Sequence, residues 1–192
     1  MSSAGRDALV AMLSRLKNDL KRADLGKPDL TKASLTSKYP LSGDYLAEVR
    51  RLCERGMEDG WLCPGENGES RSSRVAGTSA WFPFSIEASY LAGEHEAHAS
   101  PKGEVGLCFP VGGKPKYCGE EPGWVVFQPG SKHRPEASGG TMFMLSFLPD
   151  GAIERGVTVR KRRSTSTTRK SSSRSKRSSA PAARRASGGR SS

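Results

Sequence analysis

The chain has 192 residues and a formal net charge of +11, which is distributed unevenly. Residues 160–192 contain 12 Lys or Arg and no Asp or Glu, whereas the preceding 159 residues carry 19 basic and 20 acidic side chains. The first 159 residues have a net charge of −1, so the part of the chain that precedes residue 160 is not basic. No apolar stretch approaches the roughly 20 residues that a transmembrane helix needs, so we expect no membrane partner.

The four cysteines, Cys53, Cys63, Cys108 and Cys118, form no CxxC pair and have no zinc-ribbon spacing. The N-terminal residues 1–7 lack the long apolar run of a secretory signal. We therefore expect free thiols in a reducing, cytoplasmic environment. A nuclear location is the alternative for a eukaryotic source, because the C-terminal end is so basic.

Two amphipathic helices are predicted in the N-terminal part of the chain. In residues 5–22 one face collects apolar side chains at a helical period: Leu9, Met12, Leu13, Leu16 and Leu20. Gly26 and Pro28 end this helix, and a polar link follows. Ser42 is expected to cap a second helix that ends near residues 59–60. Its apolar stripe consists of Tyr45, Leu46, Val49, Leu52, Cys53 and Met57.

From residue 74 onward the pattern is typical of short strands separated by turns. Apolar and polar residues alternate from Phe84 to Tyr90. Further strands are expected at residues 104–111, 117–118, 123–128 and 141–148, with turns at 112–115, 121–123, 129–130 and 139–140. Helices followed by strands predict an α+β fold in which the helices pack on the outside of an antiparallel β-barrel.

We expect three parts: a helical region at residues 1–59, a β-barrel at 60–155 and a tail at 156–192. From residue 160 the tail contains no Leu, Ile, Phe, Val, Trp or Tyr, so it cannot bury enough apolar surface to offset the cost of ordering. We therefore expect it to be disordered. Its cations predict contact with nucleic acid or another polyanion; a targeting segment and a merely solvated tail are the alternatives.

The three histidines of the chain, His95, His98 and His133, are accompanied by Glu104. Histidine and glutamate hold first-row metals, and two histidines with one carboxylate leave coordination positions open for chemistry. His98 and Glu104 are both even-numbered, so they can face one interior, and His133 enters from another strand. The residues therefore predict a divalent metal site formed by His98, Glu104 and His133. A metal-free substrate pocket and an inert relic of the fold are the alternatives.

Two segments resemble the motifs of cupins. The segment His98-x-Ser100-x3-Glu104 is similar to the first cupin motif, and Gln128-Pro129-Gly130-Ser131-Lys132-His133 is similar to the second. More specifically, residues 60–154 resemble the 4-hydroxylaminobenzoate lyase family. The matching pieces are Gly60-Trp61-Leu62-Cys63, Ser73-Arg74-Val75, Pro101-x-Gly103-Glu104-Val105, Pro129-Gly130-Ser131-x-His133-Arg134-Pro135, Gly139-Gly140 and Leu148-Pro149-x-Gly151-Ala152-Ile153-Glu154.

With the N-terminal helices, the resemblance covers roughly residues 5–155. It implies a cupin-type lyase of aromatic-compound degradation, which converts 4-hydroxylaminobenzoate to 3,4-dihydroxybenzoate and releases ammonia. The chain departs from the family pattern at Ser100, where the first motif has a second histidine, and a hydroxyl is a poor ligand for a divalent metal. His95 could replace this ligand only if the strand bends, since residues 95 and 98 of a regular strand face opposite sides.

The resemblance also implies a small aromatic carboxylic acid as substrate. Arg74 and Arg134 are candidates for binding its carboxylate, because a guanidinium can pair with a carboxylate through two hydrogen bonds. Glu104 is the candidate for acid–base catalysis if no metal binds. The alternative function is a catalytically silent cupin that binds a small ligand and contacts nucleic acid through its tail. For the oligomeric state, a homodimer and a monomer are both compatible with the sequence.

Overall fold

The computed structural model describes residues 3–65 and 69–159 of the chain. Helices come first: α1 (Ser3–Leu13), a short 3-10 turn (Ser14–Leu16), α2 (Lys17–Arg22), α3 (Pro28–Lys38) and α4 (Asp44–Glu58). The strands are β1 (Arg71–Ala76), β2 (Phe84–Glu94), β3 (His98–Ser100), β4 (Glu104–Tyr117), β5 (Trp124–Phe127), β6 (Ser131–His133), β7 (Glu136–Pro149) and β8 (Glu154–Arg155). The short helix α5 (Thr78–Trp81) separates β1 from β2. In the part of the chain that is described, no helix is long and apolar enough to cross a membrane.

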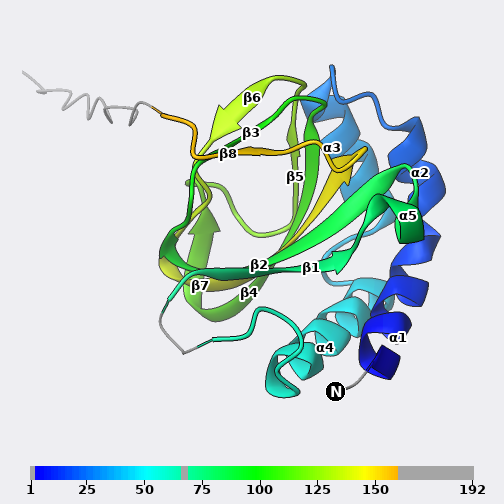
Figure 1. Ribbon diagram of the computed structural model, residues 1–192, viewed down its shortest axis with the longest axis vertical. Coiled ribbons are helices and arrows are strands. Elements are labelled where there is room, and N and C mark those ends of the chain that lie inside the picture. Colours follow the sequence, from blue (N-terminus) through cyan, green and yellow to red (C-terminus); the bar gives the residue numbers. More distant parts are fainter. Residues whose placement is uncertain (1–2, 66–68, 160–192) are drawn as a thin grey trace, which may run out of the picture. The chain divides into compact units, whose positions relative to one another are not determined.

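The strands pair in antiparallel fashion and form two sheets. The larger sheet has the order β1-β2-β7-β4-β5, and the smaller sheet has the order β6-β3-β8 (Figure 1). The α+β class predicted from the sequence, with N-terminal helices packed on antiparallel β-structure, is confirmed. The β-structure consists of these two paired sheets.

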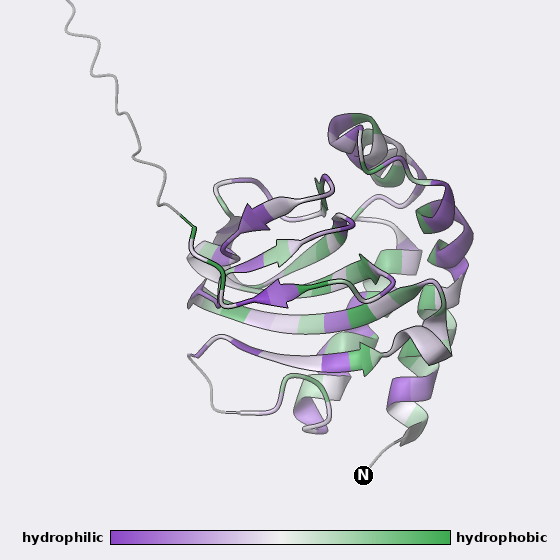
Figure 2. Ribbon diagram, turned by 45° about the horizontal axis from the view of Figure 1, so that its top comes forward, coloured by the Kyte–Doolittle hydropathy of each residue, from purple (hydrophilic) through white to green (hydrophobic). Residues whose placement is uncertain are grey.

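The two faces of the larger sheet have different neighbours, and the period of two in its strands separates them. On β4 and β7 the odd-numbered side chains, such as Leu107 and Phe147, belong to the same hydrophobic cluster as Leu13 and Val49 of the helices. The even-numbered side chains point the other way, toward the smaller sheet. The alternation of hydrophobic and hydrophilic residues along the longer strands is visible in Figure 2. One face of the sheet therefore packs with the helices, and the other carries a smaller apolar cluster together with polar residues such as Glu104.

Buried residues of the helices and of one face of the larger sheet form one cluster, so no separate core divides the helical part from the β part. A second, smaller cluster lies within the β part and includes Leu91, Cys108 and Met142. The predicted boundaries at residues 59–60 and 155–156 stay predictions. The tail, with its predicted disorder and polyanion contacts, lies from residue 160 onward outside the described residues.

Two helical predictions were wrong. The expected polar link contains α3, which begins at Pro28. Proline is favoured in the first turn of a helix because its missing N–H needs no partner there, so Pro28 starts this helix rather than only ending the previous one. The cap of α4 is Gly43 and not Ser42.

Two predicted turns, at residues 112–115 and 139–140, are also wrong. Both glycine pairs lie inside long strands, β4 and β7, where Gly113 pairs with Gly140 and the register shifts on either side. A Cβ atom at Gly140 would lie 2.1 Å from the carbonyl oxygen of Gly112. The glycines are therefore needed because two backbones approach closely, and not because the chain reverses.

We expect Gly140→Ala to lower the free energy of unfolding by about 1–3 kcal/mol, because the added methyl group meets backbone that cannot move aside. Gly77→Ala is the matched control, since a Cβ there meets only the Ser79 hydroxyl at 3.9 Å. Urea unfolding of both variants measures the difference. Equal stabilities would contradict the close approach of the two strands.

Candidate metal centre

The smaller sheet aligns three side chains in one row. His98 of β3 lies directly opposite His133 of β6 and directly opposite Arg155 of β8. Side chains of directly opposed residues in antiparallel strands point to the same face of a sheet. The pairing therefore places two imidazoles and one guanidinium side by side, facing the larger sheet.

Glu104 is the first residue of β4 and supplies the acidic group that faces this row. A tight turn precedes it, in which the backbone N–H of Gly103 donates to the carbonyl oxygen of Ser100 at 3.0 Å. Gly103 has a φ of 84°, and a Cβ there would lie 2.8 Å from the carbonyl oxygen of Phe127. The turn thus returns the chain close to β3 and leaves Glu104 fully buried.

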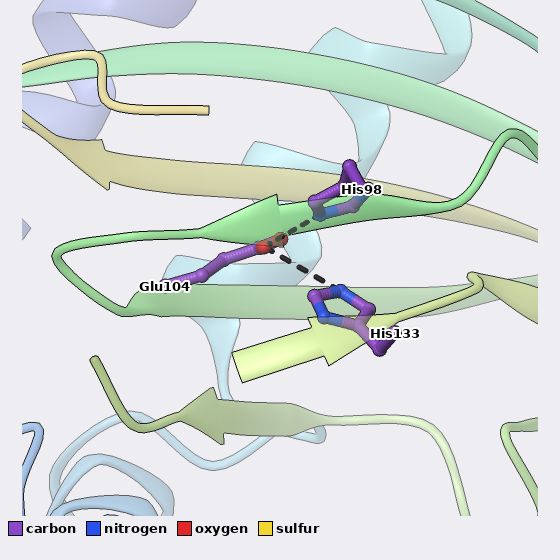
Figure 3. A group of neighbouring side chains, drawn as sticks. All are labelled: His98, Glu104 and His133. Carbon is purple, nitrogen blue, oxygen red and sulfur yellow. Dashed lines mark hydrogen bonds and ion pairs between the residues drawn. The ribbon is translucent and has the colours of Figure 1, made fainter. Parts of the chain in front are cut away.

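The carboxylate of Glu104 meets both histidines (Figure 3). Its Oε2 lies 3.0 Å from Nε2 of His98 and 3.5 Å from Nε2 of His133. The hydroxyl of Ser100 donates to the same oxygen at 2.8 Å. One ligand atom from each of His98, Glu104 and His133 lies within 4.8 Å of the others, so the three residues could hold a metal ion. The structure brings together the group predicted from the sequence.

Several polar atoms of this group have no hydrogen-bond partner among the described residues. They are Oε1 of Glu104 and both ring nitrogens of His133, all of them buried. The ring of His133 is stacked on Phe127, with centroids 3.8 Å apart and planes at 6°, which holds its orientation. Buried polar atoms are normally paired, so these orphaned atoms fit a ligand that binds them. The donor set of two imidazoles and one carboxylate suits a divalent metal.

The protonation states also suit a metal. Burial alone would raise the pKa of the Glu104 carboxyl, but the hydrogen bond with His98 and the influence of the two imidazoles outweigh burial and lower the pKa to about 2. Burial lowers the pKa of His133 to about 4, against the opposing charge of Glu104. At neutral pH an ionised carboxylate therefore faces a neutral His133 imidazole, and these are the forms that ligate metals.

Ser100 and His95, the two residues that the sequence placed in question, do not join this group. Ser100 is fully buried and directs its hydroxyl to Glu104, so it supports the carboxylate. His95 lies in the loop between β2 and β3, where its Nδ1 accepts a hydrogen bond from the N–H of Glu96 at 2.8 Å. It lines the same cavity as His98 without belonging to the group of ligands.

Neither predicted carboxylate-binding arginine lines this cavity. Arg74, whose side chain is 63% exposed, pairs with Glu87 at 2.9 Å. Arg134 lies 3.6 Å from Glu94 at the surface. Their assignment to a substrate carboxylate stays a prediction.

Sequence reasoning missed two charged residues of the cavity, Glu87 and Arg155. Glu87 lies on β2, where it is nearly buried, and its alternation with Ile86 and Ala88 was a signal that it faces away from the core. Arg155 is the last residue of β8 and directly follows the family motif that ends at Glu154. No signal pointed to Arg155, because β8 was not predicted as a strand.

The cavity beside the three candidate metal ligands His98, Glu104 and His133, called the metal group below, is small. Its space is about 20 Å³, enough for roughly one water molecule. Polar lining comes from Ser89 and Ser146 of the larger sheet, and apolar lining from Met144, Leu148 and Ile153. The cavity can therefore hold about one water beside the ionised carboxylate, and the ligand atoms of His98, Glu104 and His133 could hold a metal ion.

A family model and a related protein that match this chain carry the same description. A family model described as 4-hydroxylaminobenzoate lyase matches residues 13–155. A protein of Nocardioides sp. (strain LMS-CY) named 4-hydroxylaminobenzoate lyase is 30% identical over 165 residues, which are 79% of this chain and 93% of that protein.

Two solved structures are also similar. A cupin-like protein from Thermotoga maritima is 13% identical over 50% of this chain and 86% of its own, with a TM-score of 0.38. A Klebsiella pneumoniae protein with a double-stranded β-helix domain is 19% identical over 52% of this chain and 94% of its own, also with a TM-score of 0.38.

We expect the purified protein to bind one divalent ion, and His133→Ala to weaken that binding by on the order of 100-fold or more, since even residues that only support a ligand contribute 10–100-fold. Titration with Co²⁺, followed by its visible absorbance and by calorimetry, measures the affinity. Lys132→Ala is the control, because Lys132 is exposed on the same strand and its neighbours in sequence face the opposite side. Equal Co²⁺ affinities of the two variants would rule out His133 as a ligand.

Proposed function

Because the chain belongs to the 4-hydroxylaminobenzoate lyase family, we propose that it converts 4-hydroxylaminobenzoate to 3,4-dihydroxybenzoate and ammonia. The observation that supports this proposal is the buried group of His98, Glu104 and His133, which lies within the part of the chain that matches the family. Such a group provides a reactive centre beside a space for water.

The proposed reaction is balanced without an external oxidant or reductant. One water is consumed and one ammonia is released, while the N–O bond, the C–N bond and one ring C–H bond of the substrate break, two ring C–O bonds form and the nitrogen gains two protons. The substrate supplies its own oxidising bond, so the protein needs groups that handle protons and polarise oxygen and nitrogen. A divalent metal bound by His98, Glu104 and His133 would supply a Lewis acid for this purpose.

We assign Glu104 primarily to metal ligation. A general base works best when its pKa lies near the working pH, and the environment of Glu104 lowers its pKa to about 2. Such a carboxylate accepts protons poorly but binds cations well. Ser100 and His98 contact its Oε2, whereas Oε1 accepts no hydrogen bond of good geometry from the described residues and can take a further partner. A direct acid–base role of Glu104 belongs to the alternative in which no metal binds.

The size of the cavity sets a condition for this function. Pockets that bind small molecules usually enclose about 300–1,000 Å³, whereas the space beside His98 and Glu104 is about 20 Å³. An aromatic acid therefore enters only after lining side chains have moved. Ile153 and Arg155, near the end of the described chain, belong to this lining.

We expect the metal-loaded protein to release ammonia from 4-hydroxylaminobenzoate, with 3,4-dihydroxybenzoate in equal amount. His98→Ala should lower kcat at least about 100-fold, because loss of a preorganised electrostatic group typically costs 10²–10³ in rate. An enzymatic ammonia assay and chromatography of the product measure both quantities. Lys132→Ala serves as the control with intact turnover.

Removal of the metal by a chelator should abolish turnover, and added metal should restore it. Metal binding without ammonia release would contradict the lyase proposal and favour the alternative, a binding module for a small ligand. Turnover that persists in the metal-free protein would contradict the metal's role.

A further inference from the structure

We propose that Arg155 binds the carboxylate of the aromatic substrate, an inference that rests on the proposed function. The substrate class named by the family carries one anionic group, and an anion in a largely enclosed site needs a cation nearby. Of the Lys and Arg residues that the structure describes, Arg155 alone lines the cavity that contains His98 and Glu104.

The register of the smaller sheet determines to which face the Arg155 side chain points. It lies opposite His98, which in turn lies opposite His133, so the three side chains form one row on one face. Neighbouring strands are about 4.8 Å apart, which puts Arg155 roughly 5–10 Å from the two imidazoles along the row. A para-substituted benzene ring carries its two substituents at opposite ends, so one end can meet Arg155 while the other meets the metal group.

The contacts of Arg155 leave its guanidinium able to take an additional anion. Its guanidinium lies 3.5 Å from Glu87 and 3.9 Å from Glu96, distances too long for good hydrogen bonds. Glu87 is instead held by Arg74 at 2.9 Å. The nearly buried Glu87 is thus shared between two arginines, and with Glu96 the four side chains have no net charge, so Arg155 can take an anion because its ion pairs are long rather than because positive charge is in excess.

Arg74 and Arg134 are less suited to this role. Arg74 already donates a hydrogen bond to Glu87 and is mostly exposed, and Arg134 lies at the surface near Glu94. Glu87 is hydrogen bonded to Arg74, and it attracts Arg155 toward the cavity only through the longer ion pair at 3.5 Å.

The test measures the binding of two unreactive ligands of similar shape, the anionic 4-hydroxybenzoate and the neutral 4-hydroxybenzamide, to the metal-loaded full-length protein. Calorimetry should show that the wild-type protein prefers the carboxylate. In Arg155→Gln, affinity for 4-hydroxybenzoate should fall about 10- to 100-fold, as expected for the loss of a charge-assisted pair of hydrogen bonds. Affinity for the neutral benzamide and the Co²⁺ affinity should change less than about 3-fold.

Two further variants keep the test decisive. Arg155→Lys retains the charge without the planar fork, and it should lose less affinity for 4-hydroxybenzoate than Arg155→Gln. It also provides the comparison if the glutamine variant does not fold. Lys132→Gln removes an exposed positive charge from the same sheet, and it should leave both affinities unchanged.

The inference is overturned if Arg155→Gln weakens both ligands equally, if it weakens neither, or if the wild-type protein shows no preference for the carboxylate. The ammonia assay is a separate readout. A protein that prefers the carboxylate through Arg155 but releases no ammonia would refute the proposed reaction and leave the carboxylate site in place.

Discussion

Glu104 is ionised although its side chain has no exposed surface, and the surrounding structure is arranged around this charge. A buried carboxylate is costly unless polar groups surround it. Here Ser100 and His98 come from β3, and His133 comes from β6. The smaller sheet thus supplies every side-chain contact that the structure gives to Glu104 Oε2, and the same contacts join the two sheets across the interior.

The separation of core and site follows from the simplest property of a strand, its period of two. On β2, β4 and β7, one set of side chains packs with the helices, and the other set faces the smaller sheet. Helices that cover one face leave the opposite face free to carry Glu87, Glu104 and Ser146. The stability of the core and the chemistry of the site are therefore encoded in alternate residues of the same strands.

Much of this arrangement was predictable from the sequence. The motifs that contain His98, Glu104 and His133 were recognisable because their spacing is set by local turns, and the structure brings the three residues together from β3, β4 and β6. Sequence reasoning failed where contacts between distant segments decide the structure. At residues 112–113 and 139–140 glycine is needed because the backbone of each pair lies against the other. This close approach cannot be recognised from the sequence of either pair alone. The position of Arg155 depends on the pairing of a two-residue strand, for which no periodicity exists.

Strand β8 is only two residues long, so Arg155 is held by fewer strand pairs than the two histidines are. His98 and His133 are secured by the three-residue pairing of β3 with β6, whereas Arg155 is placed by only two paired positions at the end of the described chain. A slip of one residue in that pairing would turn Arg155 to the outer face and leave the metal group untouched, because neighbouring residues of a strand point to opposite sides. With Arg155 as the carboxylate-binding residue, the affinity for substrate can vary through the strand that follows Ile153 without any change in the residues that could hold a metal.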